Sequence, residues 1–493
     1  MLINYVVLVF YLGILLFIGV LAARQVKDIK DYYVGGKKLG YWVVAFSSRA
    51  TGSSAWVLLG LSGMGAIWGV FAYWVVIGTV SGVAISWFVM GKPFKRLTDH
   101  FDSITIPDYL ESRFQATSHR LRLVAAIALT FFVTIYVSAQ IDATGTAFES
   151  FLGWNYYTGA IVGFIIVVLY MSFGGFIAVA WSDVFQGGIM LLGLVALPLV
   201  MLTQIPSDVA SAVGSVDADL LSFWGPGGFS LLNLTKIIGF VMIGLGFLGS
   251  PQLFVRYMSI KSEAEIDRGK WVSVLLTFTM NFSAVSLGIL GRALFTSSGE
   301  DPTTTLGNGG QEVLLYSADQ LLPAVIGSFY IAAVLSAIMS TIDSLLVIAS
   351  SSVSRDLYQK VYHPQLSDNA LSTFSKKTTL FLAIMSLLVA LAVAYFSPTR
   401  TIFWFVIFGW SGIAATFCPM MILSLFWNKY TEQGALASMI TGFLSVPLFK
   451  FLLPQWEAIA PYLTNMAELF PSFIISLLVG YIISVKAHSV KSG

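Results

Sequence analysis

The sequence predicts an all-α membrane protein with 13 transmembrane helices. Its mean hydropathy is +0.83 and only 11% of its 493 residues are charged, which leaves too little polar surface to cover a water-soluble globule. A helix needs about 20 apolar residues to span a bilayer, and stretches of that length recur along the whole chain. We place the 13 helices at residues 3–22, 41–66, 70–91, 122–150, 156–174, 183–204, 231–250, 271–295, 321–352, 378–397, 401–424, 434–453 and 468–485.

The basic residues predict the orientation. Arg24, Lys27 and Lys30 follow the first apolar run and no basic residue precedes it, which is the reverse of a secretory signal peptide. With the N-terminus outside, alternate loops and the C-terminal tail hold 22 of the 27 lysines and arginines. Because basic residues favour the cytoplasmic side, we expect a multi-pass protein of a bacterial inner membrane with its N-terminus outside and its C-terminus cytoplasmic.

Two of these helices contain runs of poor helix formers. The run FSSRATGSSAW, residues 46–56, lies inside the second helix, and the run GLGFLGSP, residues 244–251, ends the seventh. Backbone within a bilayer is left without helical hydrogen bonds only where it faces protein, water or a ligand. Each run alone is also compatible with close packing of small residues between helices.

The spacing of these two runs favours a transporter, although a channel can also contain repeats. They lie five helices apart, as expected if helices 2–6 and 7–11 form two inverted repeats whose broken helices build a solute site near the midplane. The corresponding segments are 1–40 (first helix and loop), 41–204 (first repeat), 231–424 (second repeat) and 425–493 (two C-terminal helices and a short tail).

Three charged residues of the first repeat need an explanation. Arg49 is the one basic residue left inside the membrane, and Asp142 stands among apolar neighbours in the fourth helix. Either the two neutralise each other across helices 2 and 4, or one or both bind the charged ends of a zwitterionic solute. Both interpretations are correct if the pair opens when the solute binds. Asp183, where the sixth helix is predicted to begin, is either a structural N-cap or part of an inner gate or cation site that faces Asp343.

The ninth helix carries the clearest chemical pattern. Ala337, Ser340 and Thr341 share one face at spacings i, i+3 and i+4, and Ser340, Asp343 and Ser344 repeat that spacing. Hard monovalent cations bind several oxygens at about 2.3–2.6 Å, as calcium does, and hydroxyls with freed carbonyls supply them. Hydroxyl stripes also join helices, but an aspartate among them is expensive in lipid. We therefore interpret the stripe as a cation site.

The chain resembles the sodium/solute symporter family from about residue 5 to residue 485. The runs DYYVGGKKLG, GGFIAVAWSDVFQ and SAIMSTIDSLLVIASSSVSRDLY match its pattern, and FFVTIY, GSPQLFVRYM and MSTIDSLLV are similar to its sodium/proline branch. The resemblance implies a leucine-transporter-type fold with one helix ahead of the repeats. It also implies sodium-coupled uptake of a small organic solute, proline or a similar amino acid.

The resemblance further implies the site residues. A sodium site would use the carbonyls of Ala50, Ser53 and Ala337 and the hydroxyls of Ser340 and Thr341. A second sodium would lie between Asp183, Ser340, Asp343 and Ser344. Besides Arg49 and Asp142, the solute would contact Tyr136, Gln140, Ile243, Phe247 and Pro251.

Several positions depart from the sodium/proline branch. Gly52 stands where that branch commonly has a buried aspartate, Ile243 where it has tryptophan, and Phe247 where it has tyrosine. Arg49 and Asp142 add charge where the best-known proline carriers have small or apolar residues. A carrier of a sugar acid, a sugar or a vitamin carboxylate is therefore the alternative.

Other functional classes have less support. The single cysteine, Cys418, excludes an intrachain disulfide, and the sequence has no metal-ligand cluster, phosphate-binding loop or nucleophile with its base that would indicate an enzyme or a nucleotide-driven pump. A proton-coupled carrier and a membrane sensor or channel stay open. We expect a small-molecule substrate, sodium as the co-transported ion, no organic cofactor, no nucleic-acid partner, and a chain that works as a monomer in lipid.

Overall fold

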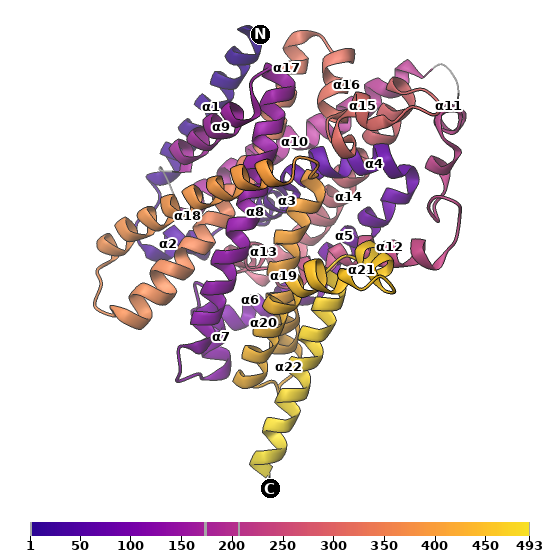
Figure 1. Ribbon diagram of the computed structural model, residues 1–493. Helices are drawn as coiled ribbons and strands as arrows, with labels where there is room; N and C mark the ends of the chain where they lie inside the picture. The colour runs from indigo at the N-terminus through magenta and orange to yellow at the C-terminus, as the bar shows by residue number, and fades with distance from the viewer. Residues whose placement is uncertain (1, 172–174, 206–207, 493) are drawn as a thin grey trace.

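The computed structural model describes residues 2–171, 175–205 and 208–492. Within these ranges the chain is helical without any strand, and its two termini lie at opposite ends of the molecule (Figure 1). Eleven described helices are long and apolar enough to cross a membrane, which confirms an all-α membrane protein. The predicted end of the fifth helix at 172–174, and residues 206–207 of the loop after the sixth, lie outside the described residues.

The helices of the first half follow the predicted order. They are α1 (Leu2–Ala23), α2 (Ile29–Val34), α3 (Tyr41–Ala55), α4 (Ser62–Trp68), α5 (Tyr73–Ile85), α6 (Gly91–His100), α7 (Ile106–Phe114), α8 (Arg120–Leu152), α9 (Tyr156–Met171), α10 (Phe176–Gln204) and α11 (Val209–Val216). The π-helical turns Trp56–Leu61 and Ser86–Met90 connect α3 to α4 and α5 to α6.

The helices of the second half are α12 (Leu231–Met242), α13 (Pro251–Ser259), α14 (Glu263–Phe295), α15 (Pro302–Leu306), α16 (Val313–Leu321), α17 (Ala324–Ser351), α18 (Asp368–Phe396), α19 (Ile402–Phe426), α20 (Glu432–Pro447), α21 (Ala460–Met466) and α22 (Leu469–Ser492). A 3-10 segment, Ile243–Leu248, follows α12, and a π-helical segment, Ser352–Tyr362, continues α17.

The predicted second and third helices form one helical path of 60 residues, Tyr41–His100. Gly69 interrupts this path, because its φ of 57° and ψ of −138° do not belong to a helix and strain any residue with a side chain. The path is therefore divided where the sequence predicted a boundary, between residues 66 and 70.

Three helices begin at least seven residues earlier than their apolar runs predicted. α10 starts at Phe176 instead of 183, α14 at Glu263 instead of 271, and α18 at Asp368 instead of 378. The added turns of α14 and α18 are polar and carry helix-start signals: Glu263 and Glu265 in the first turn of α14, and a Ser367 side chain that accepts the Ala370 N–H before α18. Hydropathy alone does not detect such turns.

Helix α17 lies at the centre of the bundle. In the most apolar 18-residue stretch of this helix 94% of the residues are buried, whereas the corresponding share is 28% in α1 and in α18. It packs against α1, α3, α8, α10 and α18. The hydroxyl stripe of the predicted cation site is therefore inside the protein and away from lipid.

An ion-pair cluster fixes the far end of this central helix. Arg122 of α8 lies 2.6 Å from Asp356 in the continuation of α17 and 2.8 Å from Asp108 of α7. Arg355 lies 3.1 Å from the other Asp108 oxygen. Helices α7, α8 and α17 are thus held together by charge at one end of the bundle.

Candidate cation and solute site

Helix α3 is broken at Ser54, inside the run that the sequence singled out. Ser54 has φ 45° and ψ −173°. The Ala55 N–H donates to the side-chain oxygen of Gln140 at 3.0 Å, and the Trp56 indole N–H donates to the Gly52 carbonyl at 3.0 Å. Side chains therefore replace part of the lost helical hydrogen bonding, as burial in a membrane requires.

The second break separates α12 from α13. After the segment Ile243–Leu248, Gly249 takes φ 157°, and α13 starts at Pro251. The indole N–H of Trp410 in α19 donates to the Ile243 carbonyl at 3.1 Å. Both predicted interruptions are confirmed, and α13 packs directly on α3.

The broken α3 meets the hydroxyl stripe of α17. The Ser340 hydroxyl lies 3.3 Å from the Ala50 carbonyl and 3.2 Å from the Ala337 carbonyl. The Thr341 hydroxyl lies 3.1 Å from the Thr51 carbonyl and 3.0 Å from the Ala337 carbonyl. All five residues are buried. Three carbonyls and two hydroxyls thus converge, a neutral oxygen set that suits a hard monovalent cation.

One predicted member of this set, the Ser53 carbonyl, stays a prediction. The Ser53 hydroxyl donates to the Arg49 carbonyl at 2.8 Å and accepts from Arg49 Nε at 2.7 Å, while the Ser53 carbonyl accepts the Trp56 N–H. The Ser53 side chain therefore bonds within its own helix, and the Thr51 carbonyl, which the sequence did not indicate, stands beside Thr341.

A buried arginine occupies the region of the expected second cation. Arg256 Nη2 lies 3.0 Å from Asp183 Oδ2 and 2.8 Å from the Ser344 hydroxyl, and it also contacts Thr51 Oγ1. Arg256 Nε donates to Ser47 at 2.9 Å. The guanidinium of α13 thereby joins α3, α10 and α17.

This arrangement corrects two expectations from the sequence. Asp183 is not an N-cap, because it lies two turns inside α10, whose cap position is Gly175. Arg256, which lies in the predicted loop between the helices 231–250 and 271–295, is fully buried in α13. One oxygen of each acid has no hydrogen-bond partner: Asp183 Oδ1 and Asp343 Oδ2. With Asp343 included, the group has two carboxylates and one guanidinium.

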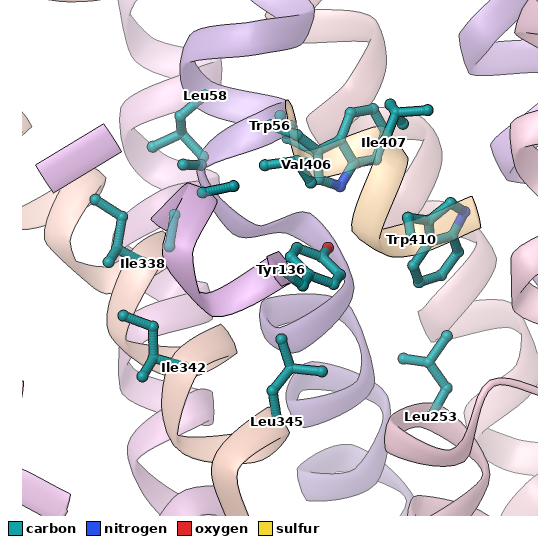
Figure 2. Close-up of a cluster of buried hydrophobic side chains, with 14 of the residues drawn as sticks. Trp56, Leu58, Tyr136, Leu253, Ile338, Ile342, Leu345, Val406, Ile407 and Trp410 are labelled. Atoms are coloured by element: carbon teal, nitrogen blue, oxygen red, sulfur yellow. The ribbon is translucent and has the colours of Figure 1, made fainter. Parts of the chain in front are cut away.

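The predicted solute positions other than Arg49 and Asp142 fall into three groups. The Tyr136 ring lies among Trp56, Leu345 and Trp410 (Figure 2), and Phe247 packs 5.0 Å from the Trp410 ring. Gln140 and Ile243 lie at the two helix breaks: the Gln140 side chain accepts the Ala55 N–H, and the Ile243 carbonyl accepts the Trp410 indole N–H. Pro251 lines a separate small cavity with Tyr33, Thr105 and Val255. Sequence reasoning missed Trp410, although an indole N–H in an apolar helix needs an acceptor.

Arg49 and Asp142 do not pair. Asp142 Oδ1 accepts from Arg400 Nε at 2.9 Å, from Arg400 Nη2 and from the Tyr156 hydroxyl at 2.5 Å. Arg49 instead contacts Ser53 and, through Nη1, the Thr277 hydroxyl at 3.3 Å. The mutual pair, one of the two alternatives considered from the sequence, is therefore wrong, since the partner of Asp142 comes from the loop before α19.

We expect Asp142→Asn to destabilise the protein without changing its sodium requirement. The substitution leaves Arg400, whose side chain is only 15% exposed, without its carboxylate, which costs about 1–3 kcal/mol. The melting temperature of the purified protein measures this loss, and Thr146→Ala, one turn along α8, is the control. Unchanged melting combined with altered solute affinity would instead place Asp142 in the solute site.

The chain is similar to a known protein family and to named bacterial transporters. Residues 32–442 match the sodium:solute symporter family. The high-affinity proline transporter PutP of Bacillus subtilis is 34% identical over 480 residues, 96% of this chain and 95% of that protein. The osmoregulated proline transporter OpuE of the same organism is 32% identical, over 96% and 93%, and sodium/proline symporter 2 of Staphylococcus saprophyticus is 31% identical, over 98% and 92%.

Solved structures share the fold. A Na⁺-coupled sialic acid symporter in a substrate-bound, outward-open state has a TM-score of 0.78 at 19% identity, covering 98% of this chain and 97% of that one. Mhp1, a nucleobase-cation-symport-1 family transporter, has a TM-score of 0.55 at 13% identity, covering 93% and 94%. At these identities the likeness concerns the fold alone.

Proposed function

The chain belongs to the sodium:solute symporter family, and from this premise we propose that it couples the entry of sodium to the uptake of proline or a similar amino acid. The observation that carries the proposal is the convergence of the Ala50, Thr51 and Ala337 carbonyls with the Ser340 and Thr341 hydroxyls. These oxygens come from the broken α3 and the central α17, so a bound sodium would fix one helix on the other.

Coupling follows from this position. Sodium binding from outside would hold α3 against α17 and so keep the break at Ser54 in the shape that receives the solute. Each sodium that moves inward through a potential of about 100 mV releases about 2.3 kcal/mol, in addition to its concentration gradient. That free energy drives accumulation of the solute.

Helix packing supports a leucine-transporter-type arrangement of 13 spans, with inverted repeats at 41–204 and 231–424 and flanking segments 1–40 and 425–493. Helix α8 packs on α19 and α10 packs on α17, two contacts that exchange when the repeats are exchanged. The contacts of α14 with α3 and of α5 with Ile243–Leu248 exchange in the same way. Thirteen spans result if Tyr41–His100 counts as two and the shorter apolar helix Tyr156–Leu169 is added.

We also propose a second, conditional sodium site at Asp183, Ser340, Asp343 and Ser344. Arg256 lies beside Asp183 and Ser344, so sodium and the guanidinium would compete for the same oxygens. Displacing Arg256 would separate α13 from α10 and α17, which gives Asp183 the gate role considered from the sequence.

The charge distribution supports a bacterial inner-membrane protein with its N-terminus outside and its C-terminus cytoplasmic. Opposite positions of the two termini agree with an odd number of spans (Figure 1). We infer a carrier and not an enzyme, which works as a monomer in lipid without an organic cofactor or a nucleic-acid partner.

We expect purified protein in proteoliposomes to accumulate labelled proline when an inward sodium gradient is applied, and not with a matched potassium gradient. A pH gradient without sodium tests the proton-coupled alternative. Unlabelled amino acids, sugars and sugar acids, added as competitors, identify the preferred solute class. Proline uptake that is indifferent to sodium would refute sodium coupling, and absence of proline uptake together with uptake of another solute would refute the amino-acid assignment.

A further inference from the structure

Arg49 is a buried cation without a counter-ion. Its side chain is 3% exposed, Nε contacts the Ser53 hydroxyl, Nη1 contacts the Thr277 hydroxyl, and Nη2 has no hydrogen-bond partner. No carboxylate of the described residues forms an ion pair with it. Arg122 and Arg256, also buried, each contact aspartates. An unpaired charge at membrane depth is costly and marks a functional site.

A small cavity lies beside this guanidinium. Its volume is about 20 Å³, and its wall includes Ser86, Trp87, Phe247, Tyr257 and Thr277. These residues come from Tyr41–His100, from both sides of the second helix break and from α14. Hydroxyl groups and aromatic rings thus surround the cavity, but no carboxylate lines it. Such a wall suits a compact solute with an apolar body.

Gly52 leaves the space next to Arg49 open. A Cβ atom at this position would lie 3.4 Å from the Phe247 ring and 3.8 Å from Arg49 Nη2. The free nitrogen, the cavity and the bare backbone of Gly52 therefore occur together.

We propose that this cavity is the carboxylate-binding site for the solute and that Arg49 is its anion-binding group. The solutes are small carboxylates, and an ammonium group is not required because no acidic side chain faces the cavity. The assignment rests on the proposed symport function and defines its solute class by the carboxylate. The carboxylate of the solute is then the counter-ion of Arg49. The pair of guanidinium and carboxylate has a net charge close to zero.

Binding to the full-length purified protein in saturating sodium tests this assignment. The probes are L-proline, cyclopentanecarboxylate, L-lactate and sialic acid, each compared with its uncharged amide by thermal stabilisation of the protein. We expect acids to bind and their amides to bind at least about tenfold more weakly. Arg49→Gln should remove this preference, and Arg49→Lys should keep part of it.

Gly52→Asp provides an independent variant. It places a carboxylate next to Arg49 Nη2, so it should occupy the anion position from within and weaken acid binding about tenfold or more. Arg292→Gln is the matched control. Arg292 is also a buried arginine with unpartnered nitrogens, but it lies in the last turn of α14 and does not line the cavity. This variant should retain the preference for acids.

The outcomes separate this assignment from the proposed function. The carboxylate site would be overturned if the amides bound as tightly as the acids, or if the wild-type protein bound none of the acids. It would also be overturned if both Arg49→Gln and Gly52→Asp kept the wild-type affinity for acids. Sodium-driven uptake that is unchanged in Arg49→Gln would overturn the site and leave the proposed symport function intact. Selective binding of acids without any sodium-driven uptake would support the site and refute symport.

Discussion

Thr341→Ala and Ser340→Ala should each raise the sodium concentration needed for half-maximal proline uptake by about tenfold or more. Each removes one of the five oxygens that converge between α3 and α17. A hydrogen-bonding or ligand group that faces a charge is worth about 1.5–3 kcal/mol, and about 1.4 kcal/mol corresponds to a tenfold change. Uptake at fixed proline, measured over a range of sodium concentrations in proteoliposomes, gives the value.

Ser336→Ala is the matched control for these variants. Ser336 is a buried hydroxyl residue of the same helix, but its hydroxyl donates to Tyr11 of α1 at 3.0 Å. Its loss should leave the sodium requirement unchanged. If both Ser340→Ala and Thr341→Ala kept the wild-type sodium requirement, the cation assignment would be wrong, whatever their effect on maximal uptake.

The sequence predicted the features that depend on local pattern. The interruptions near Ser54 and Gly249 follow from consecutive poor helix formers, and the stripe of Ser340 and Thr341 follows from the helical repeat. Each of these signals lies within a few residues of the feature it predicts. Position along one helix therefore sufficed for them.

The contacts that the sequence did not predict join residues that are far apart in the chain. Asp142 pairs with Arg400, 258 positions away, and nothing in the sequence near Asp142 indicates that arginine. Arg256 was assigned to a loop because α13 has only nine residues and is too short to give a hydropathy signal after the break. The position of the Thr51 carbonyl beside Thr341 depends on how α3 rotates against α17, which periodicity does not define.

The largest effect on the buried group of Asp183, Asp343 and Arg256 is expected from Arg256→Gln. In a sodium-free choline buffer this variant should melt well below the wild-type protein, because it leaves Asp183 buried and unpaired, a loss of about 3–5 kcal/mol. Sodium should then restore more stability to the variant than it adds to the wild type. The ion gains access to the Asp183, Asp343 and Ser344 oxygens that the guanidinium otherwise occupies or repels.

A sodium titration of melting temperature decides whether this site exists. Adding Asp343→Ala to Arg256→Gln should abolish the extra sodium stabilisation, since it removes the second carboxylate of the site. Arg122→Gln is the control: Arg122 is also buried between two aspartates, so its loss should lower the melting temperature without creating a larger sodium response. Equal sodium stabilisation of Arg256→Gln and wild type would show that the acids near Arg256 bind no second ion. Arg256 would then be a permanent structural cation that joins α13 to α3, α10 and α17, and coupling would rest on the Ser340 and Thr341 site alone.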